Sequence, residues 1–367
     1  MDGDDATAQQ GGTTGSDGER RLALALAQRL RDGGREARVQ AFWVRPAWWL
    51  VQALCAAAGI VASVLAVGDA AAGLLVAAAA LVLAVADVTR HPLLRRLTVA
   101  RATQTVVSPP IARPGERPVT LIVTAAVDRP RQGLQRRLGA PLIALSFLSL
   151  ALVAGCAAGR LAGAGRWIGV VQLVPTVVLL VALTGFLDQG LADPAADDRA
   201  PEAAVDLARA LDADPPRNLE VAVVLAGAGA ALGAGLRRWL DSRRARGLRA
   251  QDVAILHLEA WPAAGEDILW WRRDGIVLAA ALHPQLRAAA TAASGTRTPP
   301  GARVRSAPDA TGAGAARAAG WPAVAVAVGE DRDACRAFLL ELVHHLDGGL
   351  DSGAPPLHHV ESGAEPL

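Results

Sequence analysis

The sequence contains no lysine and no tyrosine, so each of its 37 basic residues is an arginine. We interpret this bias as the codon usage of a GC-rich genome and not as a means of binding phosphate. The net charge is only +2, which gives no bulk basicity of the kind that nucleic-acid binding needs, and we expect no nucleic-acid partner. The three cysteines, Cys55, Cys156 and Cys335, are scattered without CxxC spacing and predict neither a disulfide framework nor a zinc knuckle.

Apolar residues make up 52% of the chain and the mean hydropathy is +0.29, a value too high for an ordinary soluble protein. Four charge-free stretches have the length of membrane spans: Trp48–Val67, Ala70–Ala86, Ala140–Gly159 and Trp167–Leu187. About 20 helical residues cross the hydrocarbon core of a bilayer, and tryptophans flank these stretches where the membrane interface would lie. The sequence therefore predicts two transmembrane hairpins, at residues 47–88 and 140–187, with the lipid bilayer as a partner.

Arginines near the spans are far more numerous on the side that carries the bulk of the chain than in the short loop with Arg160 and Arg166. The positive-inside rule then predicts a multi-pass protein of the cell membrane, with the large domain and both termini in the cytoplasm. Residues 1–16 lack an apolar core, so we expect no signal peptide. An ion pathway would need ionisable groups in mid-span, and these stretches contain none, which argues against a transporter.

Outside the spans the pattern alternates between strands and helices. Ser16 and Glu19 form a capping-box signal, and Gly33-Gly34 predicts the end of the first helix. Asp274-Gly275 predicts a hairpin between strands at Ile268–Trp271 and Ile276–Ala281. Further strands are predicted at Arg38–Val44, Gln104–Ser108, Val119–Ala125, Leu219–Ala226, Asp252–Glu259 and Pro322–Val328, and a closing helix at Asp331–Leu346.

Continuous apolar strands separated by helices predict an α/β fold with a doubly wound, mostly parallel sheet. No segment between the hairpins is long enough to form such a core alone. We therefore expect one cytoplasmic domain assembled from residues 16–46, 89–139 and 188–350, into which the two hairpins are inserted. Residues 1–15 and the Pro/Gly/Ser-rich tail at 351–367 are expected to be disordered.

The order of these elements resembles the zinc exopeptidases of metallopeptidase family 28, which include aminopeptidases and glutamate carboxypeptidases, and more narrowly their membrane-anchored relatives. The resemblance covers most of residues 13–347 and implies the zinc-exopeptidase fold. It is carried by six segments in order: Gly15–Arg20, Ala125–Asp128, Ala196–Arg199, Ala226–Ala230, Leu256–Glu259 and Gly320–Val324.

The family's chemistry uses two zinc ions bridged by a carboxylate, with histidine and carboxylate ligands and a glutamate as general base. The resemblance places the first histidine ligand at Ala126 and the base at Gly229, and neither residue can perform the role. A carboxylate ligand falls on Ala230 and is also lost. The bridging carboxylate corresponds to Asp198, and a further ligand corresponds to Glu259.

Two more features of the site follow from the same resemblance. Asp128 corresponds to the aspartate that orients the first histidine, and here it has no histidine to orient. The loop that carries the last histidine is missing, because Gly329–Asp333 leads almost directly into the final helix. We therefore expect no catalytic base, no cofactor and no bound metal, since two oxygen ligands are too few to hold zinc.

Three hypotheses about function remain open. The leading one is a non-catalytic, peptidase-like membrane protein that binds a peptide terminus or an active peptidase relative. The second is a metal-dependent aminopeptidase or other hydrolase with an altered site, in which His257 joins Asp198 and Glu259 around one zinc ion. The third is a structural membrane protein whose cytoplasmic lobe only packs.

Overall fold

The computed structural model describes residues 12–89, 92–112, 119–131, 133–134, 138–165, 167–194, 197–260, 268–275, 280–295, 302–305 and 311–351. Contacts divide the chain into two compact units. One is an α/β unit of residues 1–44, 101–129 and 196–367, and the other is a helical unit of residues 45–100 and 130–195. Residues 45–46, 89–100, 130–139 and 188–195, which we expected in the α/β domain, group with the helices in this division.

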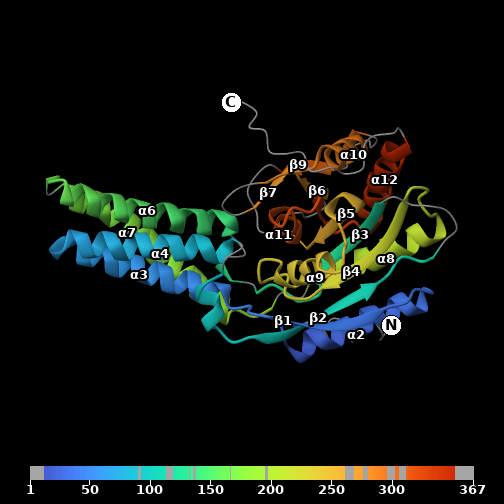
Figure 1. The fold of residues 1–367 in the computed structure, drawn as a ribbon, viewed down its shortest axis with the longest axis horizontal. Helices are drawn as coiled ribbons and strands as arrows, with labels where there is room; N and C mark the ends of the chain where they lie inside the picture. The colour runs from blue at the N-terminus through green and yellow to red at the C-terminus, as the bar shows by residue number, and fades with distance from the viewer. Residues whose placement is uncertain are drawn as a thin grey trace. The chain divides into compact units, whose positions relative to one another are not determined.

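The helical unit contains four long apolar helices that run side by side (Figure 1). Their bounds are Trp48–Gly68 (α3), Ala70–Val88 (α4), Ala140–Leu161 (α6) and Ile168–Leu191 (α7), with a short 3-10 helix, Leu94–Leu97 (η1), after α4. Each is long and apolar enough to cross a membrane, as the sequence predicted. Large apolar side chains such as Val64, Leu75 and Val170 point outward and are about 70% exposed, which suits contact with lipid.

Small residues fill the interior of the helical unit. Ala62, Ala77 and Ala182 are fully buried there, and glycines lie where two helices meet most closely. Asp69 joins α3 to α4, and its carboxylate accepts hydrogen bonds from the amides of Ala71 and Ala72 at 3.0 Å. The buried alanines and glycines allow the close helix–helix approach that small residues permit between apolar helices.

Gly73 and Gly155 allow a matched test of this packing. A Cβ atom at Gly73, on α4, would lie 2.7 Å from the backbone of Ala66 on α3, whereas one at Gly155 would meet nothing within 4 Å. We expect Gly73→Ala to lower the free energy of unfolding by about 1–3 kcal/mol, because the helices must move apart. Gly155→Ala should be neutral or slightly stabilising, since alanine favours helices. Thermal unfolding of the full chain in detergent measures both, and equal effects would contradict the packing.

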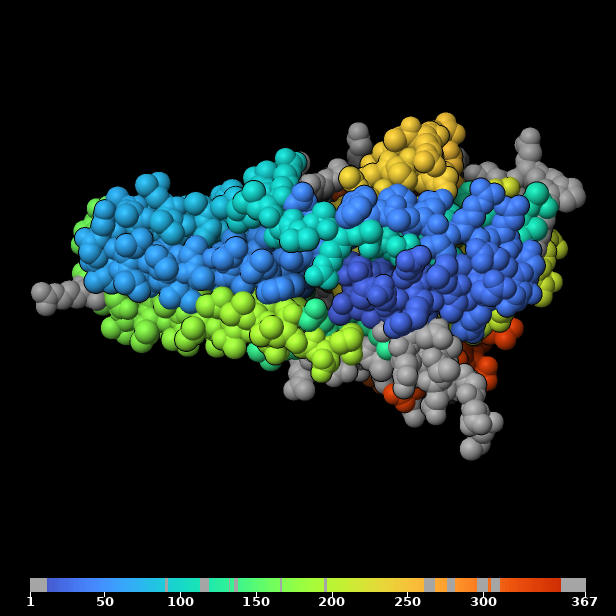
Figure 2. Space-filling model, turned by 90° about the horizontal axis from the view of Figure 1, so that it is seen from below, coloured from blue at the N-terminus to red at the C-terminus, as the bar shows by residue number. Residues whose placement is uncertain are grey.

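The α/β unit is built on an eight-stranded sheet of order β1-β2-β4-β3-β5-β10-β6-β9. The four central strands are parallel: Leu219–Ala226 (β4), Val119–Ala126 (β3), Val253–Glu259 (β5) and Ala323–Ala327 (β10). Arg101–Ser108 (β2) and Ile268–Trp271 (β6) flank them in antiparallel pairing. Arg38–Val44 (β1) and Ala302–Arg305 (β9) form the two edges. Figure 2 shows the N-terminal segments of this unit, in blue, on its surface.

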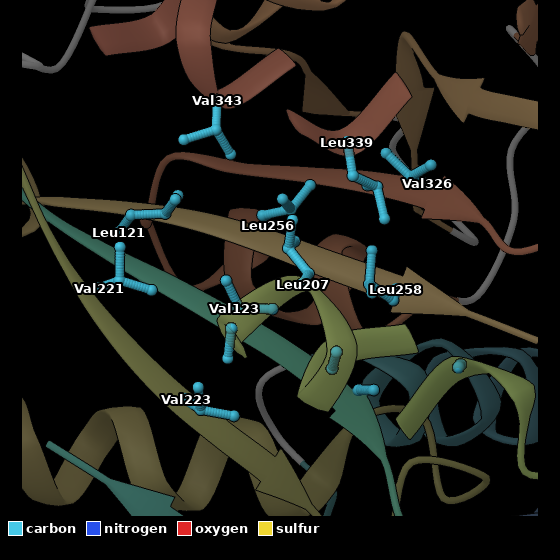
Figure 3. Packing of buried hydrophobic residues seen from close by; sticks show 14 of the residues in the cluster. Leu121, Val123, Leu207, Val221, Val223, Leu256, Leu258, Val326, Leu339 and Val343 are labelled. Carbon is cyan, nitrogen blue, oxygen red and sulfur yellow. The ribbon is translucent and has the colours of Figure 1, made fainter. Parts of the chain in front are cut away.

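Helices cover both faces of this sheet, which confirms the predicted doubly wound α/β class. One face packs against Asp17–Asp32 (α2), Arg199–Ala213 (α8), Pro284–Gly295 (α10) and Arg332–Asp351 (α12). Leu207 of α8 and Leu339 and Val343 of α12 meet the side chains of β3, β4, β5 and β10 in the core on this face (Figure 3). The opposite face packs against Ala234–Arg244 (α9) and Gly312–Ala318 (α11).

The expected hairpin at Asp274-Gly275 is wrong in one respect. Ile268–Trp271 pairs with β10 and β9 in the main sheet, and not with the segment that follows it. A separate two-stranded ladder joins Arg273–Asp274 (β7) to Ala280–Ala281 (β8), and residues 276–279 lie outside the described part of the chain. Burial explains the difference: Trp270 and Trp271 are both buried, so β6 contributes to the cores on the two faces of the large sheet.

Candidate functional site

The carboxyl ends of the four parallel strands meet at one edge of the sheet. Ala126 is paired with Ala226, and Ala327 with Glu259. Ligands of open α/β sheets bind at such an edge, because the loops and helix N-termini that follow the strands converge there. This edge therefore carries the residues that the resemblance assigned to the zinc site.

Asp128 is buried, with 3% of its surface exposed, and it joins three separate segments. Its carboxylate accepts hydrogen bonds from Thr14 Oγ1 at 2.6 Å, from the amide of Gly229 at 2.6 Å and from the amide of Ala230 at 3.2 Å. Burial raises the pKa of Asp128, and these three bonds act in the opposite direction. Asp128 thus fastens the N-terminal segment and the turn after β4 to the end of β3.

The turn after β4 leaves no room for a side chain at Gly229. A Cβ atom there would overlap the Cβ atom of Ala126 and lie 3.3 Å from Asp128 Oδ1. The same turn holds Ala228 and Leu232 with φ of 55° and 60°, a left-handed conformation that is uncommon outside glycine. The structure thus brings Ala126, Asp128, Gly229 and Ala230 together, as the resemblance implied, but in a packing without space for a base.

Asp198 is held by Arg129, the residue that follows Asp128. The guanidinium donates from Nε to Asp198 Oδ1 at 2.8 Å and from Nη2 to Oδ2. Both side chains are nearly buried, at 7% and 12% exposure, and the hydrogen bond to Asp198 raises the pKa of Arg129. Bidentate, charge-assisted pairs of this kind are stronger than hydrogen bonds between neutral groups. The positive charge beside Asp198 therefore comes from the protein itself.

Glu259 pairs with His257, two residues earlier on β5. Glu259 Oε2 lies 3.1 Å from His257 Nε2, so the two side chains share one face of the strand, as alternate residues of a strand do. The imidazole is 3% exposed and packs against Gly312, where a Cβ atom would collide with the ring. His257 therefore interacts with Glu259 and α11, and no bond joins it to Asp198 among the described residues.

Glu19 is a second buried carboxylate near Asp128. Its Oε1 accepts from Thr103 Oγ1 and from the amide of Gln104 at 3.0 Å, and its Oε2 accepts from the amide of Gly15. The predicted capping box is therefore only half formed: Ser16 Oγ accepts from the Glu19 amide at 3.2 Å, but the Glu19 side chain extends to β2. Burial raises the pKa of Glu19 from 4.5 to about 7, and the charge of Asp128 adds to this rise.

This raised pKa makes stability depend on pH. The folded chain binds a proton at Glu19 more tightly than the unfolded chain does. The contribution of protonated Glu19 to the free energy of unfolding is therefore complete below about pH 4.5 and is lost as pH rises through about 7. The loss amounts to about 3 kcal/mol. We expect Glu19→Gln to remove this part of the dependence of the free energy of unfolding on pH and to leave the part due to Asp128. The exposed Glu36→Gln serves as the control in urea unfolding followed by tryptophan fluorescence, and equal slopes in wild type and Glu19→Gln would contradict the prediction.

The connection from the last central strand to the closing helix is short. β10 ends at Ala327, and α12 begins at Arg332 with Asp331 Oδ1 accepting from the Ala334 amide at 2.8 Å. The segment offers Glu330 and Asp331 but no histidine. That a histidine-bearing loop has been lost here is what the resemblance implies.

The donor set at this edge does not fit a zinc ion. Ala126, Gly229 and Ala230 carry no ligating side-chain atom, Asp198 is paired with Arg129, and Glu259 is paired with His257. Within the described part of the chain, no group of three or more histidine, cysteine, aspartate or glutamate side chains could hold a metal ion. Two separate carboxylates, each already bonded, do not meet the three or four ligands that zinc sites use.

No protein-family model and no curated protein matches the sequence. Among solved structures, the chain is similar to a leucine aminopeptidase precursor from Bacteroides thetaiotaomicron, with a TM-score of 0.49 and 9% identity over 93% of both chains. A glutaminyl cyclase from Fimbriiglobus ruber gives a TM-score of 0.45 and 14% identity over 97% of this chain and 93% of the other. A zinc aminopeptidase from Bacillus subtilis gives a TM-score of 0.46 and 10% identity over 94% of this chain and 93% of the other. With TM-scores below 0.5 and identities of 9–14%, these similarities assign neither a family nor an activity to this chain.

The sequence alone did not reveal the roles of Arg129, Thr14 and Glu19. In the sequence, Arg129 is one of many arginines near the spans, and its place directly after Asp128 is the only local signal of its role. Thr14 lies 114 residues from Asp128 in the chain, and Glu19 lies 84 residues from Thr103. Such contacts depend on the tertiary fold, so residue spacing does not predict them.

Proposed function

We propose that this chain is a membrane-anchored, non-catalytic relative of the zinc exopeptidases that acts by binding and not by hydrolysis. The ion pair between Arg129 and Asp198 carries the proposal, because it supplies from within the protein the positive charge that a metal would supply. The crowded turn at Gly229 supports it, since a general base cannot be accommodated beside Ala126. The ligands we expect are a peptide terminus or an active peptidase relative.

Two alternatives have weaker support. A single-metal hydrolase would need Asp198, Glu259 and His257 around one ion, but Asp198 bonds to Arg129 while the other two bond to each other. A purely structural lobe would have been favoured by a fold other than α/β, and the observed sheet removes that support.

A turnover assay tests the loss of catalysis. The full chain in detergent, with added zinc or cobalt, is given aminoacyl-nitroanilides and a peptide with N-terminal glutamine, beside a zinc aminopeptidase as positive control. We expect no turnover above the blank. Turnover that Asp198→Ala or Glu259→Ala abolishes would overturn the proposal, whereas turnover that both variants retain would indicate a contaminating enzyme.

The four apolar helices support membrane association, and the arginine distribution supports a cytoplasmic α/β unit. All three native cysteines are buried, so single introduced cysteines can report the orientation. We expect Ala164→Cys, in the short α6–α7 loop, to react with an impermeant maleimide outside intact cells. Asp214→Cys, exposed after α8, should react only after the membrane is opened, and the reverse pattern would contradict this orientation.

A further inference from the structure

Residues 93–99, which follow α4 in the helical unit and include η1, present three large apolar side chains at the surface. Leu97 is 85% exposed, Val99 is 76% exposed and Leu93 is 49% exposed. The first two are more exposed than Leu75 of α4, at 71%, which points outward from the apolar helices. Single exposed apolar side chains are common, but a cluster of large ones marks a contact with lipid or with another protein.

The opposite side of this segment is fixed to the helices. Leu94 packs against the apolar cluster of the helical unit, and η1 contacts both α3 and α4. Arg95 donates from Nε to Asp87 Oδ1 at 3.1 Å and from Nη2 to Oδ2 at 2.7 Å. These two side chains are 4% and 0% exposed. The buried ion pair therefore determines which side of the segment faces the helices, and the apolar side chains of the cluster are left on the outside.

The backbone carbonyls at the end of η1 also have partners within the protein. Arg45, which precedes α3, donates from Nη1 to the carbonyl oxygen of Arg96 and, at 2.6 Å, to that of Thr98. The Thr98 hydroxyl and amide donate to the carbonyl oxygen of Arg95 at 2.8 and 3.0 Å. Polar backbone groups at a helix end need partners, and lipid cannot supply them. A segment satisfied in this way can contact lipid without leaving a carbonyl unpaired there.

The place of the segment indicates which partner covers its apolar side. It begins directly after α4 and packs against the ends of α3 and α4, so its apolar side chains continue the outward apolar surface of these helices. A position just beyond the end of a span lies at the membrane interface. Amphipathic elements bury an apolar side there to a depth of about 5–10 Å. The exposed Arg96 suits the same level, because a long basic side chain can extend its charge toward the headgroups.

From these observations we propose that residues 93–99 form an interfacial membrane anchor. Leu93, Leu97 and Val99 insert at the boundary between the lipid headgroups and the acyl chains, and the pair of Asp87 with Arg95 holds them in this orientation. The anchor fixes the depth of the end of α4 in the bilayer. This inference rests on the proposed membrane association and adds to it a contact with lipid outside the four apolar helices.

Single labelled cysteines test the depth of the segment. The three native cysteines are buried, so Leu97→Cys, Leu180→Cys and Asp214→Cys can each carry a fluorescent label in the full chain, in phosphatidylcholine nanodiscs. Leu180 is 55% exposed near the middle of α7, and Asp214 is exposed after α8. We expect a spin label near the lipid headgroup to quench the label at position 97 more than a spin label deep in the acyl chains does. The order should be reversed at position 180, and aqueous iodide should quench mainly the label at position 214.

The label at position 180 separates failure of the anchor from failure of the membrane proposal. If the deep spin label quenches position 180 while iodide quenches position 97 as strongly as position 214, the anchor is wrong and the spans remain. Shielding of position 97 from iodide and from both lipid quenchers would indicate a protein cover, such as a second copy, and would also overturn the anchor. Loss of lipid quenching at position 180 would contradict membrane spanning itself, and the anchor with it.

Two adjacent arginines provide matched variants in the Leu97→Cys chain. Arg95→Gln removes the cation that pairs with the buried Asp87, so we expect position 97 to lose its lipid quenching and to become accessible to iodide. Arg96→Gln changes the exposed neighbour, leaves the pair intact and should keep the depth profile. Equal changes in both variants would contradict the positioning role of the pair. If Arg95→Gln does not fold, the depth profile of the Leu97→Cys chain still decides the proposal.

Discussion

Replacing Asp128 with alanine is expected to lower the free energy of unfolding of the α/β unit by about 3–5 kcal/mol. The substitution leaves the Thr14 hydroxyl and the amides of Gly229 and Ala230 without their acceptor in a buried place. Each buried donor that loses its partner costs about 1–3 kcal/mol. Urea unfolding can be followed by the fluorescence of Trp239, Trp270, Trp271 and Trp321, which are buried in this unit.

Asp214→Ala is the control for this experiment, because Asp214 is exposed after α8 and no side-chain bond of it is known within the described residues. A surface change of this kind alters stability by about 0.5 kcal/mol or less. If Asp128→Ala were equally mild, Asp128 would not fasten the turn after β4, and its retention in the chain would need another explanation.

The second large effect is expected at Arg129. Arg129→Ala removes the cation from a nearly buried pair and leaves the Asp198 carboxylate without compensation. Breaking such a pair costs about 3–5 kcal/mol, whereas replacing both partners with apolar residues is often close to neutral. We therefore expect Arg129→Ala to destabilise strongly and the double change Arg129→Met with Asp198→Leu to recover most of the loss.

A double-mutant cycle over Arg129→Ala and Asp198→Ala isolates the coupling between the two side chains. A strong, favourable coupling supports the role of the guanidinium as the permanent partner of Asp198. If the two single losses simply added, Asp198 would not depend on Arg129 and would be free for another positive partner, including a metal ion.

Much of the fold could be predicted because its signals are local. The four spans and the central strands are long apolar runs, and the first span, predicted at Trp48–Val67, is a helix at Trp48–Gly68. The segments α10, β9 and α11 were not predicted. Helix α10 is rich in alanine and β9 is only four residues long, so neither shows a clear apolar period.

In the candidate site, too, some features follow from the sequence and others depend on the tertiary fold. The absence of donors at Ala126, Gly229 and Ala230 is a property of residue types, and it is the resemblance that assigns these positions to the zinc site. The pairing of Asp198 with Arg129, and of Asp128 with Thr14, joins residues 69 and 114 positions apart. Those contacts form only when α8 and the N-terminal segment reach the end of β3, so no local pattern indicates them.

Zinc retention tests the proposed loss of the metal site most directly. The full chain is purified in detergent, incubated with excess zinc, dialysed against metal-free buffer and measured by plasma mass spectrometry, with Asp198→Ala and Glu259→Ala beside it. We expect far less than one zinc ion per chain, and the same small amount of residual zinc in all three proteins. One or two zinc ions per wild-type chain, lost in either variant, would contradict the proposal and restore the hydrolase reading.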